Sequence, residues 1–214
     1  MVAAPKVELL HADAHCIVAL KASGLLSVPG LGEHGQDCLA ARVQASHADA
    51  LIVHRLDMAT SGLMLFGRGL EAQRALSRAF AARTVRKRYV AIVAGRLPAD
   101  AGEIDLPLSA DWPNRPRQQV DHTAHGKPSL TRWRVLAVDA AQGTTRLELE
   151  PVTGRAHQLR VHLRAIGHPI LGDALYAPPE VCARADRLLL HASSLGFAHP
   201  ASGAALQFES APPF

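Results

Sequence analysis

The stretch TRWRVLAVDAAQGTTRLELEPV, residues 131–152, contains two strand-like runs on either side of the short segment AAQG. In the second run, Leu147 and Leu149 alternate with charged residues at positions 146, 148 and 150. This alternation is typical of a strand with one buried face and one exposed face. Two such runs with a short polar connection predict a hairpin, and therefore an antiparallel architecture.

Further strands and helices are expected on both sides of this hairpin. Continuous β-favouring runs predict strands at 16–20, 62–66, 86–95, 187–197 and 205–211, and helical spacing predicts helices at 37–44 and 70–82. Residues 157–167 fit both periods, but Gly167 is a stop signal that favours a helix. The sequence thus predicts an α+β fold, with a mixed, largely antiparallel sheet and flanking helices.

Length and composition limit the class of protein. The chain has 214 residues and is 48% hydrophobic, which is sufficient for a real core. No repeat or long linker divides it, so one domain spanning 1–214 is expected. It has no uninterrupted apolar run near membrane-spanning length, and its first residues lack the pattern of a signal peptide. We therefore expect a cytoplasmic protein without a membrane partner.

The cysteines and histidines give little indication of a metal centre. Cys16, Cys38 and Cys182 are far apart in sequence and form no CxxC pair, so they are most simply small buried residues. His11 and His15 have the spacing of one helix turn, but no third ligand in a recognisable pattern follows them. No metal site is expected.

The distribution of basic residues favours a polyanionic partner. The formal net charge is only +4, but the arginines and lysines are clustered. Such clusters suit the phosphates of a nucleic acid, although arginines on a solvated face or paired with the nineteen acids would give the same pattern. The clusters are Arg83, Arg86, Lys87 and Arg88; Arg115 and Arg117; and Arg155, Arg160 and Arg164.

The segment HRLDMATSG, residues 54–62, places an aspartate between the apolar runs 51–53 and 63–66. Asp57 has three open interpretations: a turn or helix cap, a structural partner of Arg55, or a catalytic carboxylate. A carboxylate nucleophile must stay ionised in a poorly hydrated place, which requires a nearby cation. Candidates for that cation are Arg55, Arg155 and Arg160.

Five ordered motifs of this chain resemble those of the RluA-type RNA pseudouridine synthases. They are KASGLLSVPG at 21–30, HRLDMATSG at 54–62, RKRYVAIVAG at 86–95, TGRAHQLRVHLRAIGHPILGDALY at 153–176 and RLLLHA at 187–192. GLLSVPG, the Met58-Ala59 variant and residues 105–120 resemble the dual-specificity members of that family most closely. The resemblance covers most of the chain.

The resemblance implies an isomerase that converts uridine to pseudouridine in a central active-site cleft. It implies that Asp57 is the nucleophile, that Tyr89 packs against the base and offers its phenol, and that Arg160 pairs with the catalytic aspartate. Tyr89 could equally be a core aromatic residue. Whether Asp57 attacks C6, attacks C1′ or assists a glycal route stays open. No cofactor is required, because the leaving base returns to the same sugar.

Other residues are implied to bind the substrate. Arg55 is the candidate that fills the stack vacated by a flipped nucleotide, with an Arg55–Asp57 salt bridge as the rival role. Arg155 is a candidate for phosphate or carboxylate contact, or a plain surface arginine, and Leu171 lines the base pocket or belongs to the core. The expected phosphate contacts are Arg83, Arg86, Lys87, Arg88, Arg115 and Arg117.

The resemblance also implies the substrates. They are uridine 32 in the anticodon loop of tRNA and uridine 746 of 23S rRNA, modified by a monomer without an S4-like RNA-binding domain. The alternatives are another tRNA or rRNA uridine, or a catalytically silent RNA-binding protein. A glycosidase ranks lower, because no second acid lies in 54–62. The chain departs from the family at Ala22 and Ala156, and position 156 is given no contact.

Overall fold

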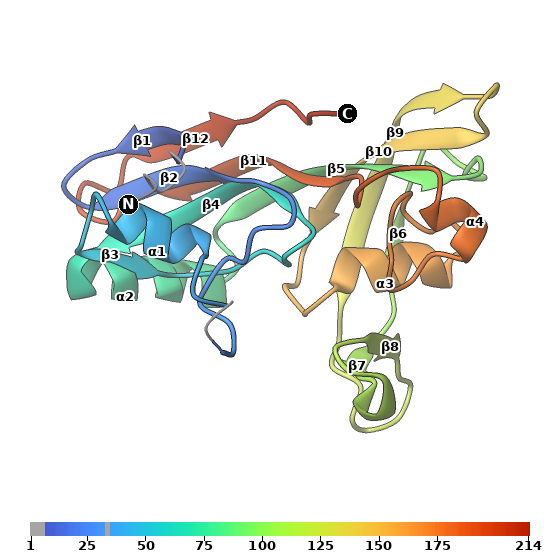
Figure 1. The fold of residues 1–214 in the computed structure, drawn as a ribbon, viewed down its shortest axis with the longest axis horizontal. Helices are drawn as coiled ribbons and strands as arrows, with labels where there is room; N and C mark the ends of the chain where they lie inside the picture. The colour runs from blue at the N-terminus through green and yellow to red at the C-terminus, as the bar shows by residue number, and fades with distance from the viewer. Residues whose placement is uncertain (1–6, 33–34) are drawn as a thin grey trace. The chain divides into compact units, whose positions relative to one another are not determined.

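The structure, a computed structural model, describes residues 7–32 and 35–214 (Figure 1). The described residues form two compact units. The first contains the chain up to Lys87 together with Ala192–Pro213, and the second contains Arg88–His191 with Phe214. The chain passes from one unit to the other inside two strands, β5 (Arg86–Ala94) and β11 (Leu190–Ala198). A single domain spanning 1–214 stays a prediction.

The first unit is built on a sheet in which β1, β2, β4 and β11 are neighbours in that order. The pairs β1–β2 and β2–β4 are antiparallel, and the short strand β3 pairs with the end of β4. Strand β12 pairs with the second half of β11. The bounds are β1 Leu9–Ala12, β2 Cys16–Lys21, β3 Ala50–Ile52, β4 Ser61–Arg68 and β12 Ala205–Glu209.

Helices α1 (Leu39–Gln44) and α2 (Gly69–Ala81) cover opposite faces of this sheet. Successive side chains of a strand point to alternate faces. One set of β2 and β4 residues, including Ile17 and Phe66, packs with α1. The other set, including Val18 and Leu65, packs with Leu76 of α2. Because β2 and β4 are buried on both faces, they read in sequence as continuous apolar runs.

Gly62 lies in β4 immediately after the turn that follows Asp57. Its φ of +119° lies outside the range that L side chains adopt readily. A Cβ at this position would lie 2.3 Å from the carbonyl oxygen of Ala192. Position 62 must therefore be glycine for the two strands to approach this closely.

The second unit contains strands β5, β10, β9 and β6 in that order. Each neighbouring pair is antiparallel, and Leu149 lies opposite both Tyr89 and Trp133. Leu147 and Leu149 are fully buried, so the predicted hairpin and its alternation are confirmed. The bounds are β6 Ala101–Asp105, β9 Leu130–Asp139 and β10 Thr144–Pro151.

A separate two-stranded ribbon in this unit consists of β7 (Leu108–Ala110) and β8 (Gln118–Val120). A short 3-10 helix, Trp112–Asn114, lies between the two strands. Figure 1 shows the ribbon set apart from the other strands of its unit. The sequence analysis did not predict it.

Helix α3 (Gln158–Ala165) settles the ambiguous segment in favour of a helix, and Gly167 with φ +85° follows its end. A short helix α4, Pro179–Cys182, was not predicted. The α+β fold class is confirmed. Among the described residues, no helix combines the length and apolar character needed to cross a membrane.

Three local expectations need correction. His11 lies on β1 and His15 in the turn that follows, so they do not share a helix. The helix expected at 37–44 begins at Leu39, because the thiol of Cys38 accepts a hydrogen bond from the Ala41 backbone N–H and caps it. Cys182 is only half-buried, whereas Cys16 and Cys38 are buried.

Candidate active site

The loop that carries Asp57 connects β3 to β4, and the segment after β2 holds it in place. The Ser27 hydroxyl donates to the Leu56 carbonyl at 2.6 Å and accepts from the Leu56 N–H at 3.0 Å. The Ser23 hydroxyl donates to the Ala59 carbonyl at 2.7 Å. The backbone on both sides of Asp57 is thus fixed by side chains that lie 29 and 36 positions earlier in the sequence than the residues they bind.

Lys21, the last residue of β2, is fully buried under this loop. Its ammonium group donates to the carbonyls of Ala22, Leu25 and Met58 at 2.9, 2.6 and 2.9 Å. A buried ammonium needs such acceptors, because desolvation without them is very costly. The lysine of the KASG segment therefore binds the main chain of Met58, the residue that follows Asp57.

His54, the first residue of the HRLD motif, has a structural role that the sequence analysis missed. Its Nε2 accepts a hydrogen bond from the Leu65 backbone N–H at 2.9 Å, and its ring stacks on Phe80 at 4.5 Å. Burial, with a contribution from the charge of Lys87, lowers the pKa of His54 to about 3. The imidazole is therefore neutral near pH 7, with its proton on Nδ1.

Asp57 itself is half-buried, and Arg55 is exposed. The Asp57 carbonyl accepts from the Thr60 N–H at 3.1 Å, which closes the turn before β4. The turn expected from the sequence is therefore present, and it is made by main-chain atoms. Because the turn uses the Asp57 carbonyl and not its side chain, it does not decide between the structural and the catalytic interpretation of the carboxylate.

In the second unit, Arg160 and Asp173 form a buried ion pair. Arg160 Nε and Nη2 donate to the two carboxylate oxygens of Asp173 at 2.9 and 2.7 Å, and the side chains are 4% and 1% exposed. Asp173 Oδ1 also accepts from the backbone N–H groups of Leu175 and Tyr176 at 3.0 and 3.2 Å. This bidentate arrangement fixes the guanidinium plane of Arg160.

The sequence analysis did not name Asp173. The aspartate of the LGD segment could have been found, because a carboxylate after a glycine is a typical turn acceptor.

The loop before α3 is fixed by a buried glutamine. Gln158 Oε1 accepts from the Thr153 hydroxyl and the Arg155 N–H at 2.7 and 3.1 Å, and its Nε2 donates to the Leu130 carbonyl at 2.9 Å. Arg155 is exposed at this loop. Gln158 thus holds the main chain of the TGR segment in place, while the side chain of Arg155 is exposed.

Tyr176 connects this loop to the β7–β8 ribbon. Its hydroxyl lies 2.6 Å from His157 Nδ1 and accepts from the Gln118 N–H at 2.7 Å. The guanidinium carbons of Arg160 and Arg117 lie 5.0 and 5.5 Å from the centroid of its ring. Two arginines from segments far apart in sequence therefore lie within cation–π distance of the same Tyr176 ring.

A family model described as RNA pseudouridylate synthase matches residues 15–165 of this chain. The chain belongs to the RNA pseudouridylate synthase family. The match includes the Asp57 loop, β5 and all of α3, and the resemblance inferred from the motifs is confirmed.

Relatives within this family are similar over nearly the whole chain. The dual-specificity RNA pseudouridine synthase RluA of Pasteurella multocida is 48% identical over 98% of this chain and 95% of its own length. RluA of Escherichia coli K12 is 48% identical over 96% of this chain and 93% of its own length. Among solved structures, human RNA pseudouridylate synthase domain containing 1 matches with a TM-score of 0.80 and 25% identity, over 98% of this chain and 84% of that one.

Two further residues expected to serve the synthase site lie in the second unit. Tyr89 is half-buried on β5, opposite Leu149. Leu171 is 5% exposed, and its backbone donates to the Ile92 carbonyl at 3.0 Å. Their roles toward a base stay predictions.

The basic residues around β5 do not form one uniform surface. Arg83 and Arg86 are exposed, whereas Lys87 is half-buried, and burial lowers its pKa. Arg88 is exposed and lies 3.6 Å from Glu148 Oε2. Since strand side chains alternate, Lys87 points to the face opposite Arg86 and Arg88.

Arg115 and Arg117 flank the turn of the β7–β8 ribbon. The Arg115 guanidinium carbon lies 3.4 Å from the centroid of the Trp112 ring, which is 68% exposed. Arg117 is half-buried beside Tyr176. An exposed indole stacked on a guanidinium can bind both a base and a phosphate.

Proposed function

We propose that the protein isomerises uridine to pseudouridine in tRNA and in 23S rRNA, at uridine 32 and uridine 746 respectively. The observation that carries this proposal is the similarity to relatives named dual-specificity RNA pseudouridine synthases, at 48% identity over 96–98% of the chain. The Asp57 loop supports it, because four hydrogen bonds with Lys21, Ser23 and Ser27 hold the main chain around one acid.

The reaction breaks the N1–C1′ bond of uridine, turns the uracil and joins C5 to C1′. The proton on C5 is released to solvent and N1 acquires a proton, so no oxidant or group donor is needed. Asp57 is proposed as the nucleophile, with Tyr89 and Arg160 acting on the same uridine. The Arg160–Asp173 pair supports this role, because it holds the guanidinium in one orientation before substrate binds.

Recognition of RNA is proposed to rest on the exposed basic residues of the chain itself. Arg83, Arg86 and Arg88 are exposed around β5, and Arg115 is exposed beside Trp112. Arg55 is exposed two residues before Asp57, where a guanidinium can stack in place of an extruded base. The protein is proposed to act as a cytoplasmic monomer.

The test uses tRNA and 23S rRNA fragments labelled with tritium at C5 of uridine. Wild-type protein should release tritium, whereas a hydrolase would release free uracil and a binding protein would release neither. Mapping of the product should place pseudouridine at the two named positions, and modification elsewhere would contradict the specificity.

The Asp57→Asn variant should lose more than about 95% of the tritium release, which corresponds to about 2 kcal/mol or more of transition-state stabilisation. Its RNA affinity should stay close to that of the wild type, since no phosphate contact is removed. Asp186→Asn, at an exposed aspartate, is the matched control and should remain active. A fully active Asp57→Asn enzyme would overturn the proposed mechanism.

A further inference from the structure

A cluster of metal-ligating side chains in the first unit takes no part in the proposed reaction. His11 lies on β1, Asp13 in the turn and Cys16 at the start of β2. One ligand atom from each lies within 4.8 Å of the other two. In the described part of the chain, this is the one group of three such residues that converges to this extent.

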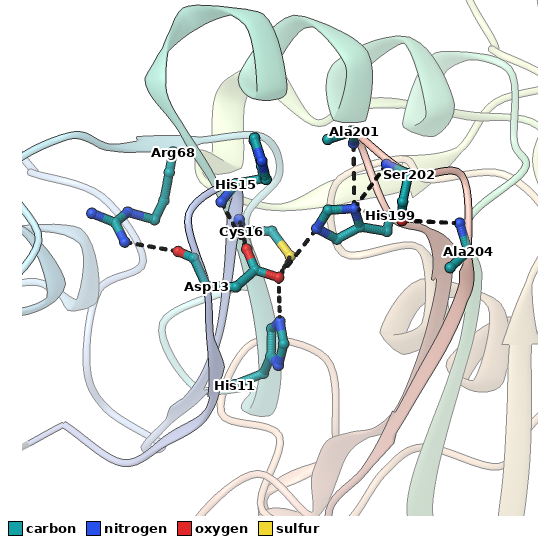
Figure 2. Close-up of polar contacts among 9 residues, drawn as sticks. All are labelled: His11, Asp13, His15, Cys16, Arg68, His199, Ala201, Ser202 and Ala204. Carbon is teal, nitrogen blue, oxygen red and sulfur yellow. Dashed lines mark hydrogen bonds and ion pairs between the residues drawn. The ribbon is translucent and has the colours of Figure 1, made fainter.

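The distances suit coordination of a single ion. His11 Nε2 lies 2.8 Å and Cys16 Sγ 3.8 Å from Asp13 Oδ2. Zinc binds nitrogen and oxygen at about 2.0–2.2 Å and sulfur at about 2.3 Å, so ligand atoms around one ion lie roughly 3–4 Å apart. Figure 2 shows the His11 ring and the Cys16 thiol directed at the Asp13 carboxylate.

The Asp13 carboxylate is held in place by its second oxygen. Oδ1 accepts from the backbone N–H groups of His15 and Cys16 at 2.7 and 2.8 Å, which leaves Oδ2 directed at the cluster. Burial raises the pKa of Asp13, but these N–H groups and His11 outweigh that effect and lower it well below the usual range. The two N–H groups on Oδ1 therefore hold the carboxylate so that Oδ2 lies beside His11 and Cys16.

His199, from the turn between β11 and β12, orients the carboxylate from the other side. Its Nδ1 accepts from the Ser202 N–H at 3.1 Å, so the neutral ring carries its proton on Nε2. That Nε2 lies 3.1 Å from Asp13 Oδ2 and donates to it (Figure 2). A histidine that hydrogen-bonds to a ligating carboxylate is a common feature around protein metal sites.

The thiol completes the cluster and lies at its buried end. Cys16 is fully buried, whereas the side chains of His11 and Asp13 are 28% and 31% exposed, so an ion can enter from solvent past them. Burial, with the nearby charge of Asp13, raises the pKa of the Cys16 thiol to about 12. A divalent cation would reverse this effect, because it favours the thiolate.

From this geometry we infer that His11, Asp13 and Cys16 form a binding site for a zinc-class divalent ion, with His199 as a positioning residue. Binding replaces the thiol proton, which passes to solvent, while the proton of the neutral His11 ring moves from Nε2 to Nδ1, and water completes the coordination. The ion would join β1 to β2 and, through His199, to the β11–β12 turn. Cys16 and Lys21 are at opposite ends of β2, roughly 16 Å apart, so the ion would not touch the Asp57 loop.

The test is titration of the metal-free, full-length protein with Co²⁺ and Zn²⁺. Co²⁺ should bind at one ion per chain with a near-ultraviolet thiolate charge-transfer band, and Zn²⁺ should displace it. Cys16→Ser should lose the band, and His11→Gln should lose one-to-one binding. Cys182→Ser and His122→Gln, at residues outside the cluster, are the matched controls and should bind as the wild type does.

His199→Ala should weaken Zn²⁺ binding by about 10- to 100-fold and leave the thiolate band in place, and His199→Gln should restore much of the loss. Zn²⁺ should raise the Tm of the wild type but not that of Cys16→Ser. Tritium release from uridine should be equal with and without Zn²⁺. A wild-type protein without the thiolate band, or a Cys16→Ser variant that retains it, would overturn the inference.

Discussion

The Asp57 loop and the Arg160 segment place their charged residues in different ways. The loop is held by hydrogen bonds from Lys21, Ser23 and Ser27 to main-chain atoms, so several contacts hold it together. Arg160 is held by one bidentate pair with Asp173, which is almost completely buried. The position of the acid is therefore set by several hydrogen bonds to the main chain around it, whereas a buried, bidentate ion pair with Asp173 fixes the plane of the guanidinium.

This difference determines how each region responds to substitution. A neutral hydrogen bond contributes about 1 kcal/mol, and its neighbours remain when it is lost. A buried charge that loses its partner is left in a poorly solvated place, which costs about 3–5 kcal/mol. Substitutions of Asp173 and Ser27 test this contrast directly, and those of His54 and Arg86 test the residues around the two regions.

Asp173→Asn should have the largest effect, a loss of about 3–5 kcal/mol in the free energy of unfolding. The amide can still accept from Leu175 and Tyr176, but it removes the negative charge that pairs with the buried guanidinium of Arg160. Denaturant unfolding measures the loss. The double variant Arg160→Gln with Asp173→Asn should lose less than the sum of the two single variants, and simple additivity would show that the pair is not coupled.

His54→Gln should remove about 2 kcal/mol of the stability loss that the wild type undergoes between pH 6.5 and 3, less than the full pKa shift implies because the residue is half-buried. The pKa of His54 falls from 6.5 to about 3 on folding, so the unfolded chain binds more protons between these values. Wild-type stability should therefore decrease as the pH falls from 6.5 toward 3. The variant should show a shallower decrease, and the exposed His122→Gln should match the wild type.

Ser27→Ala should cost about 1–2 kcal/mol, because the Leu56 N–H and carbonyl both lose their partner. The contacts from Lys21 and Ser23 remain, so the loop should stay close to its position and most of the activity should survive. Thermal unfolding and tritium release give the two values. An inactive but stable variant would show that the loop depends on this one residue.

Arg86→Ala should have the smallest effect, a change of about 0.7–0.9 in the slope of log affinity against log salt for one phosphate contact. Lys87→Ala is its matched control, because Lys87 is half-buried and points to the other face of β5. Its slope should stay closer to that of the wild type. Equal changes in both variants would mean that both side chains reach the RNA.

The local pattern of the sequence was sufficient to predict most of the secondary structure. The β9–β10 hairpin follows from alternation, and α3 follows from Gly167. Strands β1, β3 and β6 and the β7–β8 ribbon were not predicted, because each of these strands is only three to five residues long. So short a run carries too few positions for a period to be visible.

The candidate site was predicted less completely than the fold, because its contacts are remote in sequence. The motifs identified Asp57 and Arg160, but no local pattern shows that Lys21 binds the Met58 carbonyl or that Asp173 pairs with Arg160. His54 was also missed. Its bond to the Leu65 N–H becomes visible only when the strand after the loop is in place.

Gly62 shows that a residue of a sequence motif can be required by close packing of the backbone and not by the chemistry of its side chain. The final G of HRLDMATSG has no side chain to offer a substrate, yet a single added methyl group would collide with the Ala192 carbonyl. A design that transfers Asp57 and its neighbours to another protein must therefore keep glycine at this position. Alanine there would push β4 away from β11 and displace the Asp57 loop. The space that Gly62 leaves empty is in this sense a required part of the HRLDMATSG segment.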